Sequence, residues 1–175
     1  MRMRLPWVQL MECPENNTPV TREGQLILDD TMEAVREILH CANPRIEGIL
    51  PIVNLFNLRH GKAEDAIKVH EEIFENENYL RYIHSPLPDL QGHPWVWLAW
   101  TVADRASLNP RKQEIIEHVQ GKHQFAIYCR QPKHQSRKHL YAYHPNPRIK
   151  EDRERYFVEM VGMMKGYYQE KSQGR

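Results

Sequence analysis

Hydrophobic residues along this chain fall into two alternating patterns. Short continuous apolar runs, typical of buried strands, occupy residues 7–11, 48–56, 95–100 and 124–129, and a shorter run at 140–143 predicts a fifth strand. Between these runs the apolar residues recur every three or four positions, which is the spacing of a helix with one buried face. The chain therefore predicts strands and helices in turn.

Polar, proline and glycine residues mark where the predicted helices begin and end. Asp29 or Asp30 is expected to cap a helix that stops before Asn43-Pro44, and Gly61 opens a second, charged helix. Pro110 is expected near the start of a third helix, with Asn109 as its cap and Gly121 at its end. A long last helix is predicted over residues 148–171.

This alternation predicts the fold class. Strand and helix in turn favour an α/β fold, three layers deep, in which a central, mostly parallel four-stranded sheet has helices on both faces. The 175 residues show no internal repeat and no linker, so we expect one domain over residues 1–175. Parallel sheets of this kind bind ligands beyond the carboxyl ends of their strands.

Polar residues follow three of the predicted strands. Glu12 comes directly after the first run, Asn54 and Arg59 lie at the end of the second, and His144 follows the short last one. A carboxylate can activate water, an amide can pair with the edge of a base, and an imidazole can stabilise developing negative charge. We expect these side chains to meet at one edge of the sheet.

Each of these residues also has a plainer interpretation. Glu12 fits an ordinary turn residue, Asn54 fits a side chain that bonds the backbone at a strand end, and His144 before a proline fits a turn support. Arg59 fits a surface ion pair. Trp95 and Trp97 alternate on one strand face and are expected to pack in the core rather than bind a ligand.

The distribution of charge says more than its sum. The chain has 24 Lys and Arg against 23 Asp and Glu, a net charge of +1, so bulk charge marks neither a nucleic-acid binder nor a membrane binder. No acidic residue lies between Glu117 and Glu151, however, and this segment is basic. It fits either a solvated loop or a contact with nucleic acid. The residues predicted for that contact are Lys133, Arg137, Lys138 and Arg148.

Other residue types narrow the class of protein. The three cysteines form no C-x-x-C pair and fit a reducing cytoplasm, and the first residues do not resemble a signal peptide. No stretch approaches the roughly 20 apolar residues of a membrane span. The histidines between residues 118 and 144 lack the spacing of a metal site. We expect a cytoplasmic protein with no metal and no cofactor.

Four segments resemble the motifs of the uracil-DNA glycosylase superfamily. Residues 11–15 (MECPE) resemble the first motif, G-E-x-P-G, and residues 52–59 (IVNLFNLR) resemble the central segment that ends in arginine. Residues 97–103 resemble the L-G-x-x-A segment, and residues 143–147 (YHPNP) resemble the H-P-S-P motif. Their order agrees with that superfamily over most of the chain.

The same segments resemble, more closely, an uncharacterised family of phages, plasmids and bacteria, known only as domain of unknown function sixteen-forty-three. That family shows L-M-L-N-P-S followed by V-N-L-F-x-L-R, which residues 10–14 and 53–59 match. The second match is the more specific. No activity is attached to the family.

The glycosylase resemblance implies a role for each residue. Glu12 and His144 take the catalytic positions, with Glu12 on the water, and the positions that bind the base are taken by Asn54, Phe56 and Arg59. The chain departs from the motifs at Glu15 and Trp100, which stand where glycines are expected, and it lacks the cysteine ligands of the iron–sulfur glycosylases. The resemblance thus implies the fold and a pocket more firmly than it implies the reaction.

Two functions remain open at this point. The first is a protein that binds a nucleobase, nucleotide or DNA in a glycosylase-like pocket and hydrolyses an N-glycosidic bond. The second is a catalytically silent phage or plasmid accessory protein that binds a nucleotide, a nucleic acid or a host protein. In both, the expected partner is a nucleotide or nucleic acid and not a membrane. Whether the protein is an enzyme, and its oligomeric state, stay undetermined.

Overall fold

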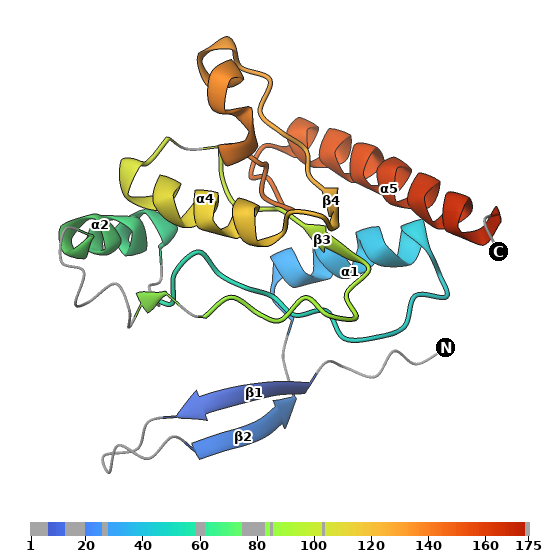
Figure 1. Ribbon diagram of the computed structural model, residues 1–175, viewed down its shortest axis with the longest axis horizontal. Coiled ribbons are helices and arrows are strands. Elements are labelled where there is room, and N and C mark those ends of the chain that lie inside the picture. Colours follow the sequence, from blue (N-terminus) through green and yellow to red (C-terminus); the bar gives the residue numbers. More distant parts are fainter. Residues whose placement is uncertain are drawn as a thin grey trace.

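The structure is a computed structural model, shown as a ribbon in Figure 1. It describes residues 7–12, 20–25, 28–58, 62–74, 83–84, 86–102 and 104–173, with the backbone alone at 7–12, 20–25 and 132–135.

Two separate two-stranded sheets make up the strands. Strand β1 (Trp7–Glu12) pairs antiparallel with β2 (Val20–Gln25), with Trp7 opposite Gln25. Strand β3 (Trp95–Trp97) pairs parallel with β4 (His123–Phe125), with Trp95 opposite His123. Figure 1 shows the β1–β2 hairpin apart from the helices, and β3 and β4 among them.

The predicted central sheet of four mostly parallel strands is wrong. Strand β1 pairs with its neighbour in sequence, β2, and not with the second predicted strand. Residues 48–58 form no strand; Pro51 there has no N–H to donate to a ladder. Residues 140–143 reach only an isolated antiparallel bridge between Tyr128 and Ala142. The described chain is α/β only through the short parallel pair β3–β4.

The helices agree better with the sequence pattern. Asp29 caps the first helix, because its Oδ1 accepts a hydrogen bond of 2.8 Å from the backbone N–H of Met32. Gly121 has a φ of +82°, a conformation that favours glycine, and follows the helix predicted to end there. The described helices are α1 (Asp30–Ala42), α2 (Ala63–Ile73), α4 (Asn109–His118) and α5 (Lys150–Gln173), with the 3₁₀ helices η1 (Ala106–Leu108) and η2 (Pro132–Leu140).

The start of α4 differs from the prediction. Asn109 is the first residue of the helix rather than its cap, because the preceding 3₁₀ turn η1 leads straight into α4. Its side-chain amide donates instead to Asp104 Oδ1 at 3.3 Å. Pro110 lies in the first turn as expected.

The main core lies between α1, α5 and one face of the β3–β4 pair. Ile38 from α1, Phe125 from β4, and Met160 and Met164 from α5 are almost completely buried there. Met160 and Met164, four residues apart, therefore lie on the buried face of α5, which covers most of the last helix predicted over residues 148–171. Burial of these side chains stabilises the fold by roughly 1.5–3 kcal/mol each.

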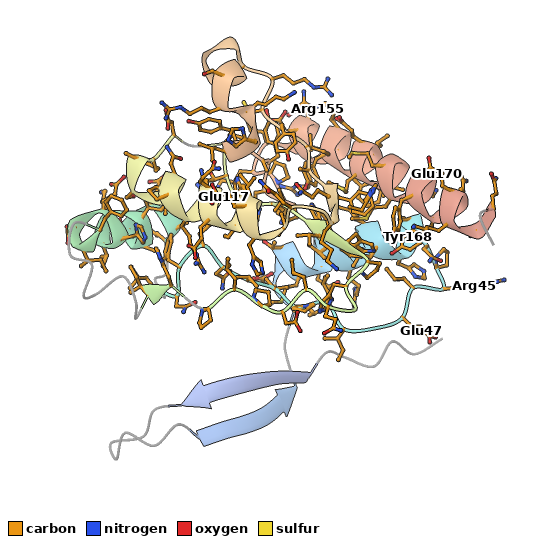
Figure 2. The ribbon with its side chains drawn as sticks, viewed as in Figure 1. Arg45, Glu47, Glu117, Arg155, Tyr168 and Glu170 are labelled. Atoms are coloured by element: carbon orange, nitrogen blue, oxygen red, sulfur yellow. The ribbon has the colours of Figure 1, made fainter. Side chains whose placement is uncertain are left out.

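Two tryptophans tie β3 to α5. The Nε1 of Trp95 donates to the hydroxyl of Tyr168, and that of Trp97 to the hydroxyl of Tyr156, each at 3.0 Å. Figure 2 shows Tyr168 on the side of α5 that faces α1, whereas Glu170 lies on the outer side. The prediction that both tryptophans are packing residues is confirmed.

Helix α4 covers the other face of β3. Val96 and Leu98, which alternate with the tryptophans, pack in a second cluster with Ile115, Ile116 and Val119 of the α4 segment. The short sheet is thus enclosed between α4 on one side and α1 with α5 on the other (Figure 1). None of the helices described is long and apolar enough to cross a membrane.

Candidate functional site

A lysine lies in the interior of the protein at the first turns of α4. Lys112 is 0 % exposed and is the largest of the fully buried side chains described. It occupies the same stripe as Ile115, Ile116 and Val119, which face the core. Burying a charged amine costs free energy of folding unless the amine is paired with an opposite charge. The groups around Lys112 therefore determine its charge state.

Tyr141 and Asp104 are neighbours of Lys112. The ammonium lies 5.4 Å from the centre of the Tyr141 ring, and the Tyr141 hydroxyl donates to Asp104 Oδ1 at 2.8 Å. The negative charge of Asp104 favours the charged lysine, but burial outweighs it and lowers the pKa of Lys112 to about 8. A fraction of the lysine is therefore neutral at physiological pH.

Arg111 adds a second buried cation beside the lysine. It is only 4 % exposed, and its guanidinium contacts the Glu114 carboxylate at 2.7 Å, one turn further along α4. Glu114 itself is about half exposed, so the pair runs from the interior to the surface. Consecutive Arg and Lys side chains place two cations at the amino-terminal end of the helix, where the helix dipole also favours an anion.

A histidine pair lies near Arg111, whose charge acts on His84. His70, on α2, is 0 % exposed, and its Nε2 lies 3.1 Å from the Nε2 of His84. Such a contact needs one ring as donor and the other as acceptor. Burial, followed by the mutual charge of His84, lowers the pKa of His70; burial and then Arg111 lower the pKa of His84. Both rings therefore favour the neutral form at pH 7.

Two phenylalanine rings lie beside His70. The Phe56 ring centre lies 4.9 Å from that of His70, and Phe74 lies 6.0 Å away. The two imidazoles are stacked at 5.4 Å. The backbone N–H of Asn57 also donates to the carbonyl of Ile83 at 2.7 Å, which holds the loop of Phe56 beside that of His84. Phe56, predicted to stack on a base, is thus part of this site.

The buried polar atoms without a hydrogen-bond partner among the residues that the structure describes include the Nδ1 of His70 and the hydroxyl of Ser107. Ser107 lies one turn before Arg111 and is 5 % exposed. Buried polar groups are normally satisfied, and orphaned ones are concentrated where a ligand or water binds. We call the residues Ser107, Arg111, Lys112, His70 and His84 the buried basic cluster.

The basic segment predicted from charge adjoins this cluster. Helix η2 packs against α4, and the residue after it, Tyr141, is the ring over Lys112. Arg137 and Lys138 on η2 are exposed, and Arg137 is close enough to Tyr141 to act on its titration. The side chain of Lys133 lies outside the described residues. Exposed and buried cations therefore meet around Tyr141.

His144 and its neighbours lie at a different place. His144 is exposed, and its Nδ1 accepts a hydrogen bond of 3.2 Å from the backbone N–H of Asn146, as a turn support would. Asn146 lines a groove of about 700 Å³ along α1, together with the α1 carboxylates Asp30, Glu33 and Glu37. Arg148, predicted to bind nucleic acid, is exposed just before α5.

The structure removes the reason for expecting the three strand-end residues to lie close together. Asn54 is exposed in a segment without strand structure, and Glu12 is described by its backbone alone, at the end of an antiparallel hairpin. Arg59 falls outside the described residues. The shared edge of a parallel sheet was the ground for expecting Glu12, Asn54 and His144 together, and that edge is not present in the described chain.

Sequence reasoning missed the buried basic cluster, although one signal pointed to it. Lys112 stands three, four and seven residues before Ile115, Ile116 and Val119, so the apolar stripe of α4 begins with a lysine. His70 likewise continues the stripe of α2 from Ala66. A polar residue on the buried face of a helix is the pattern that could have found both.

Comparison with known proteins assigns the chain to a family from its sequence and finds no similar structure. No curated protein and no solved structure matches it significantly. A family model matches residues 21–145, a range that holds every residue of the buried basic cluster and ends before α5. The chain belongs to the family described as "Protein of unknown function (DUF1643)".

Proposed function

We propose that this protein binds a nucleotide or nucleic acid and that the buried basic cluster holds a phosphate group of it. One observation carries the proposal: Lys112, fully buried, lies under Tyr141 at the end of η2, whose exposed side chains include Arg137 and Lys138. Cations thus lead from the surface to the interior, which suits an anionic ligand.

The types of side chain fit phosphate. Lysine supplies a compact charge and arginine a planar fork of donors, and both bind phosphate oxygens through charge-assisted hydrogen bonds. A phosphate would also supply acceptors for Ser107, whose hydroxyl has none among the described residues. The ring of Phe56, beside His70, offers a surface on which a base could stack.

Binding to DNA and to nucleotides tests the proposal. Fluorescence anisotropy with a labelled single-stranded oligonucleotide, and calorimetry with a nucleotide, should both detect binding. Lys112→Met, which keeps the length of the side chain, should weaken both by at least about thirtyfold, because a contact with a buried charge is lost. Lys165→Met, on the exposed part of α5, is the matched control and should bind like the unchanged protein.

The exposed cations should act differently from the buried one. Replacing Arg137 and Lys138 by alanine is expected to weaken DNA binding only several-fold and to reduce its dependence on salt concentration, since each phosphate contact contributes about one unit to the salt slope. Equal binding by Lys112→Met and the unchanged protein would contradict the proposal.

Cleavage of an N-glycosidic bond is a further step of this proposal, supported by the motif resemblance at Glu12 and His144. A uracil-excision assay on single- and double-stranded DNA checks it, with Glu12→Ala and His144→Ala as variants. Excision that both variants lose supports the assignment. Excision that persists in both refutes it, and binding without excision favours the silent accessory protein.

One observation favours a protein partner as a second candidate. The segment from Ile49 to Val53 exposes four large apolar side chains, with Ile49 89 % exposed. Contiguous exposed apolar residues are typical of protein-binding surfaces. Ile49→Lys together with Ile52→Lys should abolish binding of such a partner and leave nucleotide binding unchanged; a pull-down compared with the nucleotide titration separates the two functions.

A further inference from the structure

We infer that the contact between His70 and His84 is a switch controlled by pH. Near neutral pH it holds the segments around Phe56 and His84 against α2, and in mildly acidic solution it opens because both rings become protonated. This inference does not depend on which ligand the protein binds.

The histidine pair joins three different segments of the chain. His70 lies in α2, His84 follows Ile83 in a separate segment, and the ring of Phe56 lies 4.9 Å from that of His70. The backbone N–H of Asn57 donates to the carbonyl of Ile83 at 2.7 Å, so the last two segments are also tied to each other. Movement of His84 away from α2 would therefore displace both segments and uncover Ile83, which is now buried.

The geometry of the pair limits the number of protons that it can hold. The two Nε2 atoms lie 3.1 Å apart, a distance at which one nitrogen donates a hydrogen and the other accepts it. One added proton fits, because a charged imidazole still donates to a neutral one. A second added proton has to occupy the accepting Nε2, so that two N–H groups and two positive charges face each other. Repulsion then opens the contact.

Burial makes even the first proton unfavourable. His70 is 0 % exposed, and its Nδ1 has no hydrogen-bond partner among the residues that the structure describes. Once the pair has gained a proton, both Nδ1 atoms carry a hydrogen, so His70 would hold a buried donor without an acceptor. In the open state water can solvate that donor and the charge. Added protons therefore favour the open state.

The charged groups that act on the pair come from α2 and α4. Burial and then the charge of Arg111 lower the pKa of His84, whereas Glu114 raises it. In the other ring, burial and then the charge of its partner lower the pKa, whereas Glu71 raises it. Both carboxylates are paired with cations, Glu114 with Arg111 and Glu71 with Arg105. Because both pKa values are lowered from the ordinary 6.5, the closed contact keeps its full stability above pH 6.5 and loses it as the pH falls below that value.

Hydrogen exchange of single backbone amides tests the inference. Asn57 reports on the contact, since its N–H bonds to Ile83, and Leu98 reports on the core, since its N–H donates to the carbonyl of Phe125 at 2.8 Å. Protection factors, which correct for the intrinsic pH dependence of exchange, are measured by NMR at pH 7.5, 6.5 and 5.5. The factor of Asn57 should fall about tenfold or more from pH 7.5 to 5.5, because each released histidine contributes up to about tenfold. That of Leu98 should change by less than about threefold.

Two variants assign the fall to the histidine pair. His84→Gln removes one titrating ring and keeps a side chain that can hydrogen-bond to His70. His70→Phe removes the other ring and keeps an aromatic side chain between Phe56 and Phe74. Each should reduce the fall at Asn57 to less than about a third of its size in the unchanged protein. The matched control is His40→Gln, at an exposed histidine of α1, which should keep the full fall.

Three outcomes contradict the inference. Protection of Asn57 that is absent at pH 7.5, or that does not fall on acidification, overturns it. An equal fall at Leu98 shows that the whole molecule unfolds, which overturns a local switch. A full fall in whichever of His84→Gln and His70→Phe is folded assigns the titration to other groups. None of these outcomes bears on ligand binding, which is measured separately.

Discussion

The groove along α1 and the buried basic cluster beside α4 differ in both charge and burial. The groove is lined by three carboxylates, Asp30, Glu33 and Glu37, against two arginines, and Arg36 is paired with Glu33. The cluster buries Lys112 completely and leaves only 4 % of Arg111 exposed. One region is a solvated surface of mixed charge; the other holds two cations, Arg111 and Lys112, in the interior, with the carboxylates Glu114 and Asp104 beside them.

The contrast indicates which of the two regions would bind an anion with the more favourable electrostatic energy. In the groove, water screens each charge and the carboxylates repel phosphate. In the cluster the same charges act through a medium of lower dielectric constant, so each contact is stronger. The motif residues near His144 adjoin the groove, whereas the residues that motif reasoning overlooked form the cluster. Sequence motifs and buried charge thus point to different places.

The largest expected effect concerns Lys112. Its pKa of about 8 lies below the ordinary 10.5, so between these values the unfolded chain binds more protons than the folded one. The free energy of unfolding should therefore rise with pH from 8 to 10.5, by up to about 3 kcal/mol. Urea denaturation of the unchanged protein and of Lys112→Met at pH 7.5, 9 and 10 checks this. If the free energy of unfolding rises equally with pH in both, the conclusion that Lys112 is buried with a lowered pKa is wrong.

A smaller effect is expected at Tyr141. Tyr141→Phe keeps the ring over Lys112 and removes the 2.8 Å hydrogen bond to Asp104. Because hydrogen bonds to charged groups are worth about 1.5–3 kcal/mol, the free energy of unfolding should fall by about that much. Thermal and urea denaturation measure it. The affinity for a phosphate ligand should also fall, because Asp104 would then hold Lys112 more tightly. An unchanged affinity would show that Tyr141 takes no part in binding the ligand.

The groove offers the next test, through the cap of α1. Asp29→Ala removes the hydrogen bond to the Met32 N–H and should lower the free energy of unfolding by about 1 kcal/mol. Nucleotide affinity should not change, because α1 borders the groove and not the cluster. A loss of affinity greater than the loss of stability explains would move the binding site to the groove. Asp29→Ser, which keeps a capping oxygen, is the matched control.

The smallest structural effect is expected at His144. The side chain is exposed and bonds only within its own turn among the described residues, so His144→Ala should change the free energy of unfolding by less than about 0.5 kcal/mol. Nucleotide binding should also persist. Lost binding in a variant of unchanged stability would reverse the comparison and make the groove the functional region.

The sequence could predict features that depend on near neighbours. Asp29 as a cap and Gly121 at a helix end need only the residues beside them, and the buried stripe of α5 needs only regular spacing. The partner of a strand is a different matter. Residues 7–11 read as a strand whichever segment they pair with, and pairing with β2, a less apolar neighbour, could not be read from hydrophobicity.

The candidate site shows the same limit. Phe56 was predicted as a ligand-stacking residue, and its ring does lie beside the cluster, but its contact there is His70 on α2, which no motif marked. Burial of Lys112 depends on what α4 packs against, and composition treats a lysine as a surface residue. Chemistry that arises from burial becomes visible only when the tertiary neighbours are known.

The indole–phenol hydrogen bonds between β3 and α5 make the intrinsic tryptophan fluorescence sensitive to the packing of α5. Trp95 and Trp97 both donate to tyrosines of α5. Detachment of that one helix would therefore expose both indoles to water and shift their emission to longer wavelength. Trp100 donates to the carbonyl of Leu140, on the side of η2. Intrinsic fluorescence can therefore follow the carboxyl-terminal helix and the η2 side of the molecule without any attached dye.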